Sequence, residues 1–291
     1  MPRLGLAMPV HRIAAIMSPP PPPSWVDADK RKRRAPESSS GGDQDPPRPE
    51  TIIDISGVPE LKDGTLDVGF DIGYPPLEFL PDGDSSPTGL DVDMASALAR
   101  KLGIQVRFHD TEFGKLVRAL KGKRFDIIMS AMTITEKRQK EIDFVSYFAT
   151  GMMGTGIVVA RDNQKRIRRL PDLCGLKVVV QKGTVQADEI GGIVCAQKLK
   201  IDVNAFDRHS DALARLRQGR ADALLLDISA ASYLAEQSDG ELEVAPHQFQ
   251  YAPYGIGIRK DSTLLNAALT LALKELKSSG AYNDTLKQWS A

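Results

Sequence analysis

The sequence predicts an α/β protein with two lobes, each a mostly parallel sheet flanked by helices. From about Leu61 onward, short apolar segments typical of strands alternate with longer segments typical of helices. A second series of such segments begins after Gly154, which indicates two lobes rather than one. Two strand segments contain the runs VVV at 178–180 and ALLL at 223–226, as expected for parallel strands covered on both faces.

The alternation predicts each element in turn. In the first series, strands are expected at 65–70, 104–108 and 125–129, and helices at 90–103, which Gly103 ends, and at 113–123. The second series places its helices from 184, over 210–218, over 228–237 and over a long terminal segment, 262–280. Its strands are expected at 155–161, 176–181, 202–206, 221–227 and 254–259.

The first 60 residues have a different composition. Positions 1–50 hold 11 of the 19 prolines, including Pro19–Pro23, and a basic run at 30–34 follows. Such a segment has too little apolar surface to offset its ordering entropy, so residues 1–60 are predicted to be a disordered, solvated linker. Residues 1–17 resemble a secretory signal poorly, because proline and charged residues interrupt the apolar segment.

Composition limits the class of protein further. The 291 residues carry 38 basic and 38 acidic side chains and are 42% apolar, which suits one or two globular domains and argues against nucleic-acid binding. There is no run of about 18 apolar residues, the length that a membrane span requires. Cys174 and Cys195 lie in no metal-binding pattern, and no cofactor is expected. They either form a disulfide, which implies an oxidising compartment, or remain buried thiols.

Polar side chains cluster where predicted strands end, which is where α/β sheets bind ligands. Ser130 and Thr133 follow one strand, Thr184 follows another and begins a helix, and Asp227 ends a third. Thr133 and Glu136 fit a capping box for a further helix start.

Arg138 then falls in the first turn of that helix, where an acidic residue is more usual. Alone, Arg138 could be a surface residue and Asp227 a helix cap. Together, an arginine and two helix N-termini suit an anion and the aspartate suits a cation. These are the charges of an α-carboxylate and an α-ammonium group.

The chain resembles the polar amino-acid solute-binding proteins of ABC uptake systems. These are type II periplasmic binding proteins such as the histidine-, lysine/arginine/ornithine- and glutamine-binding proteins. The likeness covers residues 62–291 and rests on blocks in the right order: GFDIGYPPLEF, GLDVDMASALARKLG, FDIIMSAMTITEKRQKEIDFVSYF, VVVQKGTVQ, GRADALLLD and SGAYNDTLKQW. It implies an exported, periplasmic or extracellular monomer that carries an L-amino acid to a membrane permease.

The resemblance also implies roles for individual residues. Arg138 would bind the ligand carboxylate with help from Thr133, and the turn at Thr184 and Val185 would close on the same group from the other lobe. Val185 replaces a threonine of some relatives, so only its backbone would serve. Asp227 would bind the ammonium group.

The remaining implied contacts concern the ligand side chain. Tyr74 and Phe113 would sandwich it, although either aromatic residue could equally belong to the core. Ser130 would line the site, and Ala131 replaces a second serine. Asp71 and Gln181 stand at positions that vary with the ligand among relatives, and they favour a polar or cationic amino acid.

The family architecture implies that the chain crosses between lobes twice. Lobe 1 would comprise residues 62–157 and 256–291, and lobe 2 residues 158–255, with a hinge that closes the lobes around the ligand. Two other functions share this fold. A cyclohexadienyl (arogenate/prephenate) dehydratase would need a general acid in the cleft, and a sensor ectodomain would need a transmembrane segment. The intact Arg138 and Asp227 pair favours the carrier.

Overall fold

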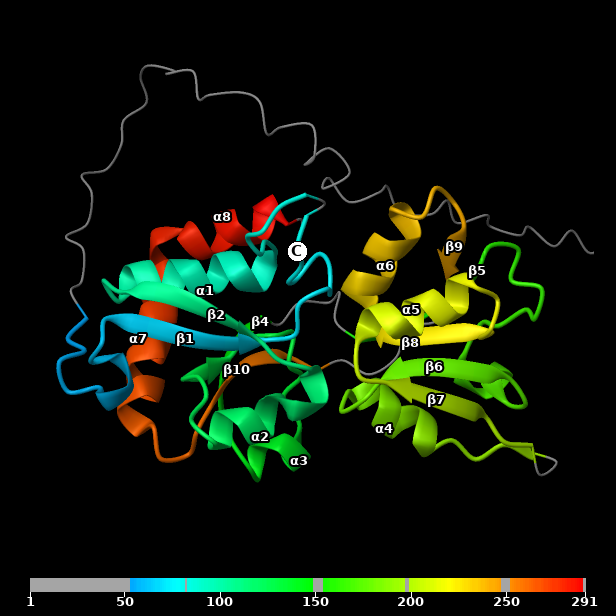
Figure 1. The fold of residues 1–291 in the computed structure, drawn as a ribbon, viewed down its shortest axis with the longest axis horizontal. Helices are drawn as coiled ribbons and strands as arrows, with labels where there is room; N and C mark the ends of the chain where they lie inside the picture. The colour runs from blue at the N-terminus through cyan, green and yellow to red at the C-terminus, as the bar shows by residue number, and fades with distance from the viewer. Residues whose placement is uncertain (1–52, 82, 149–153, 197–198, 247–251, 290–291) are drawn as a thin grey trace, which may run out of the picture.

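The protein consists of two five-stranded sheets that lie side by side (Figure 1). The computed structural model describes residues 53–289 except 82, 149–153, 197–198 and 247–251. The first sheet has the strand order β2-β1-β3-β10-β4. Its strands are β1 (Thr65–Phe70), β2 (Gln105–Asp110), β3 (Ile127–Ile128), β4 (Asp143–Phe148) and β10 (Tyr254–Ile258). Its helices are η2 (Pro59–Leu61), α1 (Leu90–Lys101), η3 (Phe113–Lys115), α2 (Leu116–Lys121), α3 (Glu136–Gln139), α7 (Thr263–Ser279) and α8 (Ala281–Gln288).

The second sheet has the strand order β7-β6-β8-β5-β9. Its strands are β5 (Thr155–Ala160), β6 (Lys177–Gln181), β7 (Asp202–Phe206), β8 (Ala223–Asp227) and β9 (Leu242–Val244). Its helices are η4 (Leu170–Leu173), α4 (Val185–Gly191), α5 (His209–Arg217) and α6 (Ile228–Glu236).

Each sheet is mixed, rather than mostly parallel as was predicted, and is covered on both faces. In the first, β1 is parallel to β2 and β3, whereas β10 runs antiparallel to β3 and β4. In the second, β6 is parallel to β7 and β8, and β5 is antiparallel to β8 and β9. The parallel, fully covered strands predicted from VVV and ALLL are therefore confirmed, since β6 and β8 pair in parallel and every residue of β8 is buried.

Two apolar clusters flank each sheet. In the first lobe, α1 and α7 pack on one face and α2 on the other. In the second lobe, α5 and α6 pack on one face, and η4 and α4 on the other. The two-lobed α/β class predicted from the sequence is thus correct. The long terminal helix predicted over 262–280 corresponds to α7, and a further helix that was not predicted, α8, follows the left-handed Gly280.

The chain passes between the sheets at two places. It leaves the first sheet after Phe148 and enters the second at Thr155, and it returns between Val244 and Tyr254. The predicted boundaries at 157/158 and 255/256 fall inside β5 and β10, because a strand belongs with the sheet to which it is hydrogen-bonded. We propose lobe boundaries a few residues earlier, before Thr155 and before Tyr254.

The predicted disordered segment is too long at its C-terminal end. Residues 1–52 lie outside the described residues, but Ile53 and Val58 are buried in the core of the first lobe. The carboxylate of Glu60 accepts a hydrogen bond from Ser262 and pairs with the buried Arg259 at 2.9 Å. Residues 53–60 therefore belong to the folded lobe.

Two deletions separate these parts of the chain. Removing residues 1–52 is expected to leave the melting temperature unchanged, because that segment is proline-rich and poor in apolar surface. Removing residues 1–60 should lower the melting temperature clearly, since each buried aliphatic side chain is worth about 1.5–3 kcal/mol and Arg259 would lose its ion pair with Glu60. Calorimetric melting of both proteins checks this, and equal melting temperatures would contradict it.

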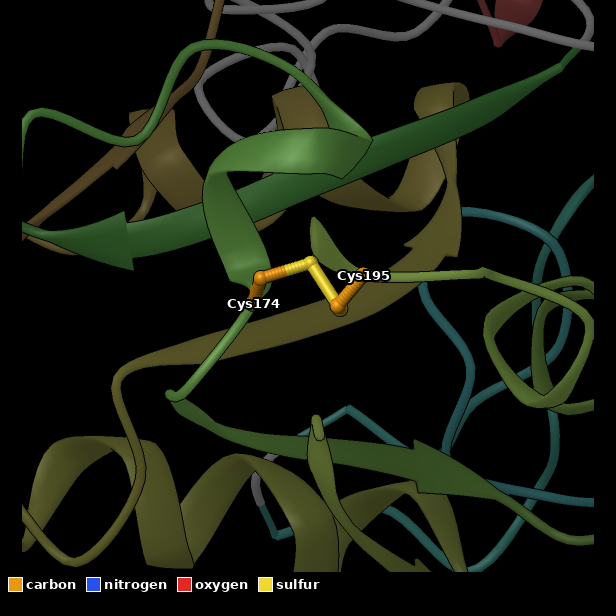
Figure 2. The surroundings of a disulfide bond; sticks show 2 residues. All are labelled: Cys174 and Cys195. Carbon is orange, nitrogen blue, oxygen red and sulfur yellow. A yellow bond between two sulfur atoms is a disulfide. The ribbon is translucent and has the colours of Figure 1, made fainter. Parts of the chain in front are cut away.

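Cys174 and Cys195 form a disulfide in the second lobe (Figure 2). Their Cα atoms are 5.7 Å apart, and the bond ties the end of η4 to the segment after α4. Of the two alternatives left open by the sequence, paired cysteines are therefore the one found.

Among the described residues, no helix is both long and apolar enough to cross a bilayer.

Replacing both cysteines with alanine is expected to lower the free energy of unfolding by about 3 kcal/mol, because the bond closes a loop of 21 residues in the unfolded chain. Denaturant unfolding of the variant and of the oxidised protein measures the difference. Affinity for ligand should not change, because neither cysteine lines the cavity described below.

Candidate functional site

A cavity lies between the two lobes and receives side chains from both. It contains about 390 Å³ of space, partly open to solvent. The structure brings together every residue predicted to contact the ligand: Asp71, Tyr74, Phe113, Ser130, Thr133, Arg138, Gln181, Thr184, Val185 and Asp227. Their individual roles toward a ligand remain predictions, and the geometry of each group bears on them.

The guanidinium group of Arg138 is held from both lobes. Nη1 donates to the carbonyl oxygen of Thr133 at 2.6 Å, and Nη2 donates to the carbonyl oxygen of Gly183 at 2.9 Å. The guanidinium carbon lies 5.3 Å from the ring centroid of Phe113, a cation–π distance. Burial lowers the pKa of Arg138 to about 10, so the group is a cation at neutral pH. A guanidinium has five N–H donors, which leaves donors for an anion.

The predicted capping box at Thr133 and Glu136 is wrong by two residues. The N-cap of α3 is Thr135, whose hydroxyl accepts the backbone N–H of Arg138 at 3.2 Å. Thr133 cannot take that place because its backbone forms an isolated β-bridge with Tyr254. The helix α3 has only four residues, so its dipole is small and opposes the arginine little.

The turn after β6 brings the second lobe close to the first. Gly183 has a φ of 79°, and a Cβ built there would lie 2.8 Å from the Cα of Gly114. Any side chain at Gly183 would therefore hold the lobes apart. The hydroxyl of Thr184 accepts from the N–H of Ala187 at 3.2 Å and donates to the carbonyl of Gln181 at 2.7 Å. Because this hydroxyl is used within the turn, any contact with a ligand falls to the backbone N–H groups.

Asp227 occupies the N-cap position of α6, but its side chain does not cap the helix. Its carboxylate instead lines the cavity. It accepts from the hydroxyl of Tyr74 at 2.8 Å and from the amide of Gln186 at 3.1 Å. The Tyr74 oxygen in turn accepts the backbone N–H of Asp227 at 2.9 Å. Burial raises the pKa of Asp227. Neutral donors thus hold a buried carboxylate in place beside the cavity.

The two aromatic residues make different contacts. Phe113 lies against Arg138. Tyr74 bonds Asp227 across the cleft, and its ring meets that of His209 edge-on at 5.0 Å between centroids. The predicted sandwich of a ligand side chain between Tyr74 and Phe113 remains a prediction.

Asp71 is buried, and both of its carboxylate oxygens accept hydrogen bonds from other groups of the protein. One oxygen accepts from the guanidinium of Arg208. The other accepts from the side-chain amide of Gln181 and from the backbone N–H of Phe113, the latter at 3.0 Å. Although burial raises the pKa of Asp71, the neighbouring Arg208 opposes that shift.

Buried acids support the back of the cavity. The hydroxyl of Ser130 accepts the N–H of Asp71 at 3.0 Å and donates to Glu78 at 2.7 Å. Asp91 accepts from the hydroxyl of Tyr147 at 2.5 Å. Burial, followed by the charge of Asp91, raises the pKa of Glu78 well above its usual value. The Ser130 hydroxyl therefore connects the backbone of Asp71 to the carboxyl group of Glu78.

Four residues at or beside the cavity were not predicted from the sequence, namely Glu78, Gln186, Arg208 and His209. Arg208 and His209 come two and three residues after the end of β7, so the strand-end rule that selected Asp227 also applies to them. The described residues contain no group of three or more His, Cys, Asp or Glu side chains that could hold a metal ion.

The fold and the cavity define a two-lobed ligand-binding protein whose cleft offers a cation from one lobe and a carboxylate from the other. Residues 66–291 match the model of the bacterial extracellular solute-binding proteins, family 3. The chain belongs to this family.

Its relatives include proteins of known ligand. The L-cystine-binding protein TcyJ of Escherichia coli (strain K12) is 30% identical over 78% of this chain and 82% of the relative. The structure of an ancestral arginine-binding protein bound to arginine is 34% identical, with a TM-score of 0.72 over 78% of this chain and 98% of that one. The ancestral amino acid-binding protein AncCDT-1, a precursor of cyclohexadienyl dehydratase, is 34% identical, with a TM-score of 0.71 over 79% and 97%. All three are binding proteins rather than enzymes.

Proposed function

We propose that this chain binds an L-amino acid between its lobes and delivers it to the membrane permease of an ABC transporter. One observation carries the proposal: Arg138 and Asp227, from different lobes, line the same cavity. The first is a desolvated cation with N–H donors to spare, and the second is a buried carboxylate that two neutral donors orient.

The two charges suit the common part of every L-amino acid. Arg138 would take the α-carboxylate, with the backbone of the turn after β6 completing that end. Asp227 would take the α-ammonium group. Since the two groups belong to different lobes, a bound amino acid connects the lobes and stabilises the closed arrangement. Of the relatives named above, one binds cystine, one binds arginine and the third is an amino acid-binding protein, which supports an amino acid as the ligand.

The compartment of the protein follows from the same proposal. The family is extracellular by description, and the disulfide between Cys174 and Cys195 fits an oxidising environment. We place the chain outside the cytoplasm, as a monomeric carrier that meets the permease at the membrane surface.

A thermal-shift series tests the function. The protein is melted with each of the twenty amino acids, with prephenate and with arogenate, and each shift is followed by calorimetry. A ligand present at 100 times its Kd stabilises the folded state by about 2.7 kcal/mol, so a true ligand raises the melting temperature clearly. We expect one or a few amino acids to do so. No shift with any amino acid, together with turnover of prephenate or arogenate, would replace the carrier with the dehydratase.

A further inference from the structure

Arg208 lies beside the cavity, where it pairs with Asp71 of the cavity lining, and it joins the two lobes. It precedes α5 in the second lobe, whereas its partners Asp71 and Asp110 belong to the first. Nη1 and Nη2 donate to the two carboxylate oxygens of Asp110 at 2.7 and 2.9 Å, and Nη1 also donates to Asp71. This fork-on-fork pairing is the strongest geometry available to an arginine and a carboxylate.

The pairing leaves no free acid for a cationic ligand side chain. Asp71 is occupied by Arg208, by Gln181 and by the N–H of Phe113. Asp227 is the partner proposed for the α-ammonium group. The remaining carboxyl of the cavity lining, Glu78, accepts from the hydroxyl of Ser130 at 2.7 Å, and its burial raises its pKa and so opposes the charged form. A second cation would therefore have to displace Arg208 or lie beside it with like charge in a partly dry cleft, where repulsion is stronger than in water.

His209, the next residue, offers a different kind of contact. It lines the cavity and is only 6% exposed, and its Nε2 has no hydrogen-bond partner among the described residues. Burial lowers its pKa to about 4, so the ring is neutral at pH 7. A buried ring nitrogen without a partner costs free energy unless a ligand supplies one. The edge-on contact with Tyr74 fixes the ring beside the cleft.

We propose that Arg208 is a specificity-determining residue: by occupying Asp71 from within the protein it excludes cationic side chains, and the cleft takes an amino acid whose neutral, polar side chain bonds His209 Nε2. A carboxamide fits this contact, because it can donate to the nitrogen or accept from it. The inference rests on the proposed function and narrows its ligand class.

The experiment uses L-glutamine and L-arginine as probes in calorimetry at pH 7. The wild-type protein should bind glutamine at least 10-fold more tightly than arginine. Arg208→Gln frees the buried carboxylate of Asp71 beside the ligand, so the affinity for arginine should rise. The ratio of the affinity for arginine to the affinity for glutamine should increase by at least 10-fold. His209→Phe keeps an aromatic ring against Tyr74 but removes the ring nitrogen, so the affinity for glutamine should fall about 10-fold.

Lys137→Gln is the matched control. Lys137 makes an ion pair between the lobes, with Asp188 at 2.8 Å, but is exposed and does not line the cavity. It should leave the ratio of affinities unchanged, which separates specificity from lobe closure. Tighter binding of arginine by the wild type, or an unchanged ratio in Arg208→Gln, would overturn this inference and leave the amino-acid carrier standing. Absence of binding by every amino acid would overturn the carrier as well.

Discussion

Arg138→Ala is expected to weaken the binding of any L-amino acid that the wild type binds by at least about 100-fold, or some 2.7 kcal/mol. The variant loses a charge-assisted pairing with the α-carboxylate, and each such hydrogen bond is worth about 1.5–3 kcal/mol. The carboxylate is then left in a partly buried site without its partner. Because every amino acid carries this group, glutamine, arginine and cystine should all be affected in the same proportion.

A ligand without the carboxylate provides the internal control. The α-amide of the preferred amino acid should bind the wild type weakly and should lose nothing further in Arg138→Ala. The difference between the two ligands isolates the contact between the guanidinium and the carboxylate, as a double-mutant cycle does. If Arg138→Ala binds amino acids as tightly as the wild type does, the ligand lies elsewhere and the proposed function loses its basis.

The neighbouring lysine distinguishes binding from folding. Lys137→Ala removes a cation from the same short helix, and its side chain is 76% exposed and outside the cavity. Its affinity should stay within about two-fold of wild type, since surface ion pairs contribute about 0–1 kcal/mol. Melting curves of both ligand-free variants should lie close to that of the wild type, because the two carbonyls that Arg138 releases can reach water when the lobes open.

Local sequence signals placed most of the fold. The strands at 65–70 and 202–206 and the helix starts at Leu90 and Val185 agree with prediction to within a residue, because hydrophobic period and turn residues act over a few positions. Among the described residues, two strands, β4 and β9, were not predicted from the sequence. Strand β4 carries half-buried and exposed residues among its apolar ones, and β9 has only three residues.

Most residues that line the cavity could be predicted from the sequence, but their hydrogen-bond partners could not. A polar residue at the end of a strand is expected beside the ligand whatever its own hydrogen-bond partner is. The partners of that residue come from other parts of the chain: Tyr74 and Asp227 are 153 positions apart, and Arg208 and Asp71 are 137 apart. No local pattern encodes such pairs. Asp71 was therefore expected to face a cationic ligand, whereas the fold supplies the cation itself.

Asp227→Asn is expected to weaken amino-acid binding by at least about 100-fold as well. The substitution removes the charge that attracts the α-ammonium group, and it keeps the size of the side chain and one acceptor for Tyr74 or Gln186. Stability of the ligand-free protein should change little, since the side chain of Asp227 does not cap α6 and its buried charge already opposes folding, as its raised pKa indicates.

The dependence of binding on pH supplies a second measurement for the same residue. A protonated Asp227 cannot balance the ammonium charge, so wild-type affinity should fall as the pH falls through the raised pKa of this carboxyl, beginning above the range of an ordinary aspartate. In Asp227→Asn that fall should be absent or much smaller, although Asp91, with a pKa of about 6, still titrates behind the cavity in both proteins. Calorimetry of both between pH 4 and pH 8 compares them. Parallel pH profiles would show that Asp227 does not hold the ammonium group, even if the variant binds weakly.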